Sequence, residues 1–199
     1  MSDYSFIVLD SVSKYKEFKS ELVQLDSEYA SWNISTFNDF NPNYKNIIEN
    51  AFKLNIDELL QKLNREKESG IPEKDTDEKN IRYFTTGNFL VVLIRNSTEF
   101  IGKMAFLTKN EQMGLLSSVY IKPANRGNGL GLMLFNKIKD LAREKEIKKI
   151  YLETFPFMKS AIKLYKRAGF RECDHYSFVG HSRETGVVLE SIYMELELE

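Results

Sequence analysis

The sequence predicts one α+β domain built on a mixed, mostly antiparallel sheet flanked by helices. Apolar residues at helical spacing dominate the N-terminal part of the 199-residue chain. From residue 88, short apolar, β-branched and aromatic runs alternate with polar turns, a pattern typical of antiparallel strands. A strand, a helix and a strand then follow in series, which indicates a right-handed crossover between neighbouring strands. Repeats, low-complexity segments and dividing linkers are absent from the sequence, so we expect a single domain over residues 1–199.

The N-terminal elements are a short strand and several helices. Residues 5–9 read as a strand. The apolar residues that follow recur at offsets of four, seven and eleven, as on one face of a helix: Phe18, Leu22, Leu25 and Tyr29. The same spacing predicts helices around 44–51 and 56–63. We interpret about 33–70 as a helical insertion that forms either a wall of an acceptor pocket or a homodimer surface.

Strands and helices alternate through the C-terminal half. Three strands within 88–121 form a meander, and 129–146 carries an apolar stripe opposite charged residues, which predicts the clearest helix. A strand over 148–155 and a helix over 158–168 follow, and the next glycine can end that helix in a left-handed cap. Residues 192–198 alternate apolar and polar side chains, as in a half-buried strand.

Composition excludes several classes of function. The formal net charge is −1, from 28 basic and 29 acidic residues, so nothing drives the chain toward nucleic acid or anionic membranes. The single cysteine, Cys173, excludes an internal disulfide, and with only His175 and His181 nearby it offers no zinc-ligand spacing; we expect no metal. The first ten residues lack a signal-peptide pattern, and no run approaches the ~20 apolar residues of a membrane span. We therefore expect a cytoplasmic protein.

The chemically informative segment is the connection between a strand and the long helix, residues 119–135. Gly127, Gly129 and Gly131 allow the backbone to turn tightly and to approach a ligand without a Cβ. Free amides and the positive end of the helix dipole then form an anion site, to which Arg126 adds a charged donor. The alternative is a glycine-rich connection chosen only for its geometry. The lysine and hydroxyl residue of a Walker loop and the final glycine interval of a dinucleotide fingerprint are missing.

This segment resembles motif A of the GNAT superfamily of acyl-CoA-dependent N-acyltransferases, Arg/Gln-x-x-Gly-x-Gly/Ala, through Arg126, Gly129 and Gly131. The run 119–123 is similar to the end of that family's fourth strand, and Leu-Tyr-Lys-Arg-Ala-Gly-Phe at 164–170 is similar to the segment that closes its coenzyme A site. The resemblance covers about residues 88–170 closely. It implies a sheet with splayed central strands and acetyl-CoA as co-substrate.

The resemblance also implies roles for individual residues. Backbone groups of Val119 and Ile121 would pair with the pantetheine arm of the cofactor. The pyrophosphate would be bound by the amides of the turn, which comprises Arg126, Gly127, Asn128, Gly129, Leu130 and Gly131. Tyr165 would protonate the leaving thiolate; the alternative is an aromatic side chain on a buried helix stripe. Many relatives have asparagine where this chain has Met158, which cannot supply the same hydrogen bonds.

The acceptor side is less marked. An attacking amine must lose a proton, and Glu153 is the best carboxylate candidate for a general base, with a surface or structural role as the alternative. Glu111 is expected in a solvated turn, and Cys173 lacks a neighbouring base. We expect the walls of an amine pocket to be the strand around Glu153, the inserted helices around Trp32 and Tyr44, and the segment 171–190 with Tyr176 and Phe178.

Three functions follow from the sequence. The first is an N-acetyltransferase that acts on a small-molecule amine by direct transfer in a ternary complex, with a peptide or protein acceptor as its variant. The second is a non-catalytic module that binds acyl-CoA, and the third is an interaction protein that keeps only the fold. The glycine turn disfavours the third function, and Tyr165 favours the first over the second.

Overall fold

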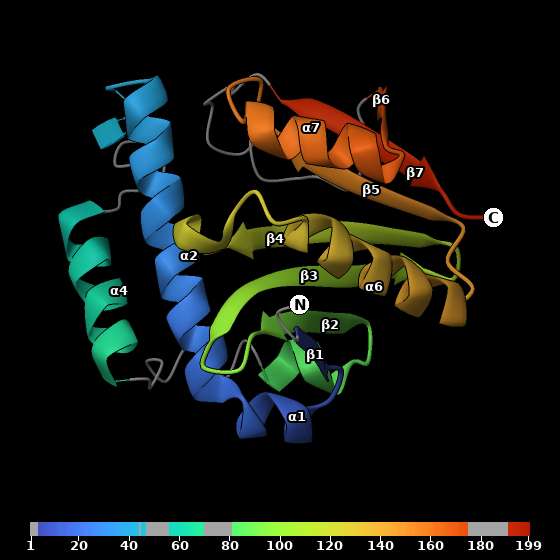
Figure 1. Ribbon diagram of the computed structural model, residues 1–199, viewed down its shortest axis with the longest axis horizontal. Helices are drawn as coiled ribbons and strands as arrows, with labels where there is room; N and C mark the ends of the chain where they lie inside the picture. The colour runs from blue at the N-terminus through green and yellow to red at the C-terminus, as the bar shows by residue number, and fades with distance from the viewer. Residues whose placement is uncertain (1–3, 44, 47–55, 70–80, 175–190) are drawn as a thin grey trace.

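A computed structural model describes residues 4–43, 45–46, 56–69, 81–174 and 191–199 (Figure 1). Its elements in chain order are β1 (Ser5–Leu9), α1 (Val12–Glu17), α2 (Lys19–Phe40), α4 (Ile56–Ser69), β2 (Phe89–Arg95), β3 (Phe100–Asn110), β4 (Met113–Ile121), the 3-10 turn η1 (Pro123–Asn125), α6 (Leu130–Glu144), β5 (Lys149–Thr154), α7 (Lys159–Ala168), β6 (Arg171–Cys173) and β7 (Ile192–Glu197). None of the described helices is long and apolar enough to cross a bilayer.

The strands form one seven-stranded sheet in the order β1-β2-β3-β4-β5-β7-β6. Every neighbouring pair is antiparallel except β4 and β5, which run parallel on either side of α6 in the chain. This confirms the predicted mixed, mostly antiparallel sheet and the meander of β2, β3 and β4. The β4–β5 ladder joins only residues 113–115 to 149–151, so the two strands part beyond Leu115 and Tyr151. The central strands are therefore splayed, as the resemblance implied.

A bulge lies in β4 directly after this point. Lys103 pairs with Tyr120 and Ala105 pairs with Ser117, so two residue steps on β3 match three on β4. Ser118 takes up the extra residue with a left-handed φ of 49°, which is uncommon for a residue other than glycine. A bulge bends and twists its strand. The bend falls in the part of β4 that has left β5.

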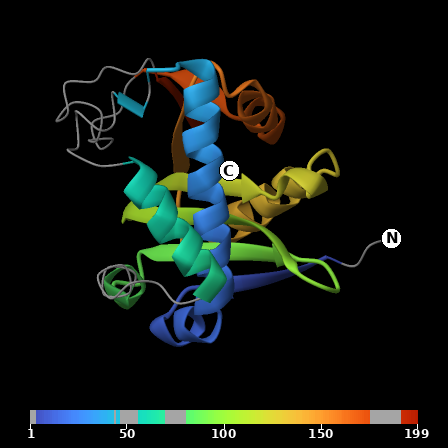
Figure 2. The same ribbon diagram turned by 90° about the vertical axis from the view of Figure 1, so that its left-hand side faces the viewer.

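Helices cover both faces of the sheet. The α6 and α7 side holds the larger core, whose fully buried members include Val92, Met104, Phe106, Leu134, Phe135, Ile138, Ile150 and Met194. The α1 and α2 side holds a second core, which includes Leu9, Tyr15, Leu22, Leu25, Leu93 and Tyr120. In Figure 2, α2 runs across the sheet from the β1 side to the β5 side. The apolar stripe predicted from Phe18 onward is what packs it there.

Some elements differ from the sequence prediction. Helix α2 continues to Phe40 without a break, so the predicted start of the inserted helices at 33 lies inside it. The helix predicted around 44–51 lies mostly outside the described residues, whereas the one around 56–63 is α4. The helical residues 81–85 and the three-residue β6 were not predicted, because segments this short show no clear periodicity.

Candidate functional site

The glycine turn lies between η1 and α6. Gly127 and Gly129 have φ values of 86° and 76°, and Gly129 is the N-cap of α6 in the left-handed region. A Cβ at either position would meet no atom within 4 Å, so backbone conformation rather than crowding requires glycine there. Among the described residues, no backbone carbonyl accepts from the amides of 127–131. These amides, at the positive end of the α6 dipole, form a place where an anion can bind.

Gly131 has a different role from the other two glycines. It lies in the first turn of α6, and a Cβ added there would come within 2.8 Å of Leu164 Cδ2 on α7. Its φ is not positive. The missing side chain therefore lets α6 and α7 approach closely, in addition to any contact between the Gly131 amide and a ligand.

Arg126 links the turn to α2. Its Nε donates to the carbonyl oxygen of Ile121 at 2.9 Å, and its guanidinium carbon lies 4.6 Å from the centre of the Trp32 ring. The side chain thus fixes the shape of the connection after β4 and extends toward the α2 face of the sheet. The carbonyl of Ile121, one of the groups expected to pair with the pantetheine arm, is already engaged in this contact.

The gap between β4 and β5 begins after Leu115 and extends along β4 toward the turn. Val119 has no Cα partner in β3, because the bulge removes it from the ladder, and the β5 side of β4 is unpaired from Leu116 onward. An unpaired strand edge offers hydrogen-bonding groups to an extended ligand. The structure therefore places Val119 at an edge that is open to such pairing, whereas the carbonyl of Ile121 already accepts from Arg126.

Tyr165 is buried on the α7 side of this gap. Only 6% of its surface is exposed, and its ring packs edge-on against Phe170 with 6.0 Å between centroids. Burial raises the pKa of its hydroxyl above the ordinary value for tyrosine, and Tyr29 adds a smaller contribution in the same direction. Tyr165 is thus a protonated donor at neutral pH. A tyrosine that keeps its proton can act as an acid and cannot act as a base.

Glu153 belongs to the opposite face of β5. Leu152 and Thr154 are buried toward α6 and α7, so the side chain between them points to the α2 side. Its Oε1 accepts from the hydroxyl of Ser191 at 2.6 Å. The two residues predicted to be catalytic therefore approach the sheet from opposite sides, and Glu153 already has a structural partner.

Three aromatic residues cover β4 on the α2 side: Tyr29 and Trp32 of α2 and Tyr120 of β4, with ring centroids 5.8 to 6.5 Å apart. Cations pack on both ends of this cluster. The Lys103 ammonium lies 5.1 Å from the centre of the Tyr29 ring, and Arg126 lies over Trp32. The cluster connects the glycine turn to the middle of α2.

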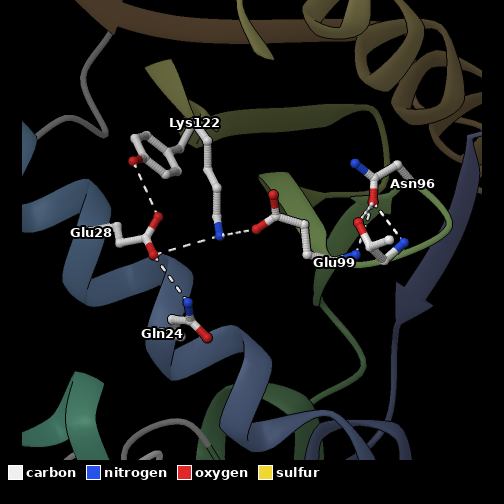
Figure 3. A network of polar contacts seen from close by, with 7 residues as sticks. Gln24, Glu28, Asn96, Glu99 and Lys122 are labelled. Carbon is white, nitrogen blue, oxygen red and sulfur yellow. Dashed lines mark hydrogen bonds and ion pairs between the residues drawn. The ribbon is translucent and has the colours of Figure 1, made fainter. Parts of the chain in front are cut away.

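A polar network holds α2 against the end of β4 (Figure 3). Glu28 accepts from the Tyr120 hydroxyl at 3.5 Å and lies 3.6 Å from the Lys122 ammonium, which also contacts Glu99 at 2.8 Å. Burial, then the charge of Glu28, raise the pKa of Tyr120 to about 12. Sequence reasoning missed this network, because its members are far apart in the chain. A hollow beside it is lined by Glu28, Ser31, Asn64, Glu99, Tyr120, Lys122, Pro123, Ala124 and Asn125.

The remaining predicted residues add little to the site. Cys173 is half-buried, and burial raises the pKa of its thiol, which disfavours a nucleophilic thiolate. Glu111 is exposed in the β3–β4 turn, as predicted. Met158 is the N-cap of α7, and its sulfur lies 3.8 Å from Thr154 Oγ1. The pocket candidates Tyr44, Tyr176 and Phe178 and the two histidines, His175 and His181, lie outside the described residues.

Two further observations concern ions and charge. Within the described ranges, no three His, Cys, Asp or Glu side chains gather in a way that could hold a metal. A hollow on the outer face of α7 is lined by Lys159, Ile162, Lys163, Lys166 and Arg167. None of the turn residues 126–131 lines this hollow.

Comparisons with known proteins identify the family and the fold of the chain. The family model described as "Acetyltransferase (GNAT) family" matches residues 56–170, more than half of the chain. An uncharacterised N-acetyltransferase of Escherichia coli K12, YjgM, is 41% identical over 75 residues, which are 37% of this chain and 45% of that protein. The thialysine N-ε-acetyltransferase of Sus scrofa is 33% identical over 57 residues, 29% of this chain and 34% of that protein. The matched stretches thus span less than half the length of these relatives.

The fold extends the likeness to almost the whole chain. An acetyltransferase structure from Streptococcus agalactiae is superimposable with a TM-score of 0.59 at 17% identity, covering 98% of both chains. At this identity the likeness concerns the fold alone. The likeness confirms the predicted fold, and the family match assigns the chain to a family of acetyltransferases. The chain is a member of the GNAT acetyltransferase family.

Proposed function

We propose that this protein transfers an acetyl group from acetyl-CoA to the primary amine of a small molecule, directly, in a ternary complex in the cytoplasm. The observation that carries the proposal is the turn at the N-terminus of α6, whose amides from Gly127 to Gly131 have no backbone partner among the described residues. This turn opens beside the gap between β4 and β5. The turn could hold a pyrophosphate, and the open edge of β4 could hold the extended pantetheine arm of the same cofactor.

The donor would lie between the splayed strands. The amides of the turn would bind the pyrophosphate, with Arg126 at its rim, and the free edge of β4 at Val119 and Ile121 would pair with pantetheine. Arg126 donates through Nε to Ile121, which leaves its terminal nitrogens as further donors. The thioester would then point toward Tyr165, on the α7 side of the gap.

The transfer needs a neutral amine and a proton for the leaving sulfur. The amine nitrogen attacks the thioester carbonyl, the C–N bond forms and the C–S bond breaks. Tyr165, kept protonated by burial, gives its proton to the departing thiolate. The nitrogen releases one proton to solvent or to Glu153, whose carboxylate lies on the α2 side of β5. We propose that the amine approaches from this side, opposite Tyr165.

The acceptor is proposed to be a small molecule. The net charge of −1 gives the chain no electrostatic attraction to nucleic acid, which disfavours a nucleic-acid-bound protein as acceptor. The pig relative is named for thialysine, a small amine, over a match of 57 residues. Peptide N-termini are the alternative acceptors. A non-catalytic acyl-CoA-binding module is the other alternative, and the presence of Tyr165 at the position of the family's proton donor favours catalysis over it.

The test is thiol release from acetyl-CoA in the presence of thialysine, spermidine, 2-phenylethylamine or a tripeptide, each at the same concentration. We expect turnover with at least one small amine, and mass spectrometry should show its acetylated product. Turnover confined to the tripeptide would favour the peptide reading. Binding of acetyl-CoA without transfer to any amine would instead support the non-catalytic module. Sedimentation at several concentrations would test the homodimer proposed for the region around 33–70.

A further inference from the structure

Helix α2 bridges the gap between β4 and β5 on the face opposite α7. Near its middle, Tyr29 and Trp32 pack on Tyr120 of β4. Two turns later, Phe37 packs edge-on against Phe155 and Phe157, which follow β5, with ring centroids 4.8 and 4.9 Å apart. The helix rises by 1.5 Å per residue, so these two contacts are about 12 Å apart along its axis. The stretch from Tyr29 to Phe37 therefore spans the open part of the gap.

Asn33 occupies the middle of that stretch. Positions 29, 33 and 37 are four residues apart, so they share one face of the helix. Tyr29 and Phe37 contact the two sides of the gap, and the side chain between them must face the gap itself. Asn33 Oδ1 is buried, and no donor among the described residues reaches it.

An unpaired buried carbonyl oxygen is costly. Leaving such a group without a donor costs about 1–3 kcal/mol, and asparagine is also a poor residue for a helix interior. Two other side chains of α2, Ser27 and Asn38, have an unpartnered buried oxygen as well. At 100° per residue both are turned more than 100° away from Asn33 around the helix. Of these three residues, Asn33 is thus the one whose unpartnered oxygen lies on the face of α2 that covers the gap, the face of Tyr29 and Phe37.

The charge of this stripe indicates what it can bind. Between Tyr29 and Phe37 the stripe carries no ionisable side chain other than the tyrosine, and Asp26, one turn earlier, is paired with Lys103. A neutral carbonyl between aromatic rings suits an N–H donor carried on an apolar stem. It suits a carboxylate poorly, because both groups are acceptors.

We propose that Asn33 binds the acceptor substrate: its Oδ1 accepts a hydrogen bond from the primary amine that attacks the thioester, beneath the aromatic residues of α2. This inference rests on the proposed function and adds the group that recognises the amine. The amine held by Asn33 approaches the thioester from the α2 face of the sheet. Tyr165 donates a proton to the leaving sulfur from the α7 face.

The test is Asn33→Leu, which keeps the side-chain shape and removes the acceptor. We expect kcat/KM for 2-phenylethylamine to fall about 10- to 100-fold, the loss of one hydrogen bond of roughly 1.5–3 kcal/mol. The Kd for acetyl-CoA should not change. Because the oxygen is unsatisfied in the free protein, Tm should stay level or rise, whereas a purely structural asparagine would lower it. Asn38→Leu is the matched control on the other side of α2, and it should leave the KM for the amine unchanged.

A second readout does not depend on turnover. The side-chain amide resonances of Asn33, assigned with the Asn33→Leu variant, should shift when 2-phenylethylamine is added to protein saturated with coenzyme A. Parent kinetics in Asn33→Leu together with unmoved Asn33 resonances would overturn the inference while leaving the proposed function intact. Shifted resonances without acetyl transfer to any amine would support amine binding by Asn33 and contradict the proposed function.

Discussion

Replacing Gly129 by alanine separates the anion site from the stability of the fold. Gly129 has a φ of 76°, and a Cβ there would meet no atom within 4 Å. The cost to folding is therefore backbone strain alone, about 1–2 kcal/mol for a residue other than glycine in this region. For a chain of this size each kcal/mol lowers Tm by roughly 2–4 °C, so we expect a decrease of about 2–8 °C.

The effect on acetyl-CoA should exceed this strain. A methyl group at the N-cap of α6 blocks the approach of the pyrophosphate, and relaxation toward negative φ would turn the neighbouring amides away. The loss of one or two hydrogen bonds to a charged group, about 1.5–3 kcal/mol each, raises Kd at least ~10-fold. Isothermal titration calorimetry with acetyl-CoA measures this change directly.

Gly87→Ala is the matched control for this variant. Gly87 has a φ of 69° and equally open space around its missing Cβ, so it carries the same strain. Its carbonyl accepts from Lys145, the C-cap of α6, which places it at the other end of the helix from the turn. Gly87→Ala should lower Tm by a similar amount and leave the Kd for acetyl-CoA unchanged. Equal affinity in the folded Gly129→Ala variant and the parent would refute the anion site.

Two other predictions concern tyrosines. Tyr165→Phe should lower kcat by ~10- to 10⁴-fold with little change in acetyl-CoA affinity, since it removes only the proton donor, and unchanged turnover with rate-limiting chemistry would leave Tyr165 a purely structural residue. Tyr120 has a pKa of about 12 in the fold, whereas a tyrosine in the unfolded chain ionises near pH 10, so its stabilising effect is complete below pH 10 and is lost as pH rises toward 12. Urea midpoints between pH 9 and 12 should therefore fall less steeply for Tyr120→Phe than for the parent, and parallel declines would contradict this account.

Local patterns predicted the parts of the fold that depend on neighbouring residues. The apolar stripe of α6 predicted a helix, and the alternation of apolar and polar residues in β7 predicted a strand. Both predictions needed only the repeat of apolar residues along one segment, every 3.6 residues in a helix and every 2 in a strand. The tight turn at Gly127 and Gly129, which both have positive φ, was also expected from the local glycine pattern. The parting of β4 from β5 was expected only through the family resemblance, since composition and spacing carry no sign of it.

Contacts between distant segments account for what the sequence did not predict. Glycine is required at position 131 because Leu164 of α7 packs against it. The side chain of Arg126 is positioned by its contact with Trp32 of α2. Neither partner is marked by a local pattern. The opposite orientation of Glu153 and Tyr165 required knowing which face of β5 each helix covers. The sequence does not mark Asn33 as a site residue. Its position at the gap follows from the path of α2 across the sheet.

The most direct test of the central claim is a titration of ¹⁵N-labelled protein with acetyl-CoA, followed by amide chemical shifts. We predict that the amides of Gly127, Gly129 and Gly131 shift most and saturate together, because the pyrophosphate binds them. The alternative anion-binding surface is the basic outer face of α7, lined by Lys159, Lys163 and Lys166. Shifts confined to that face, with the glycine amides unmoved at saturation, would contradict the claim that this turn binds the donor.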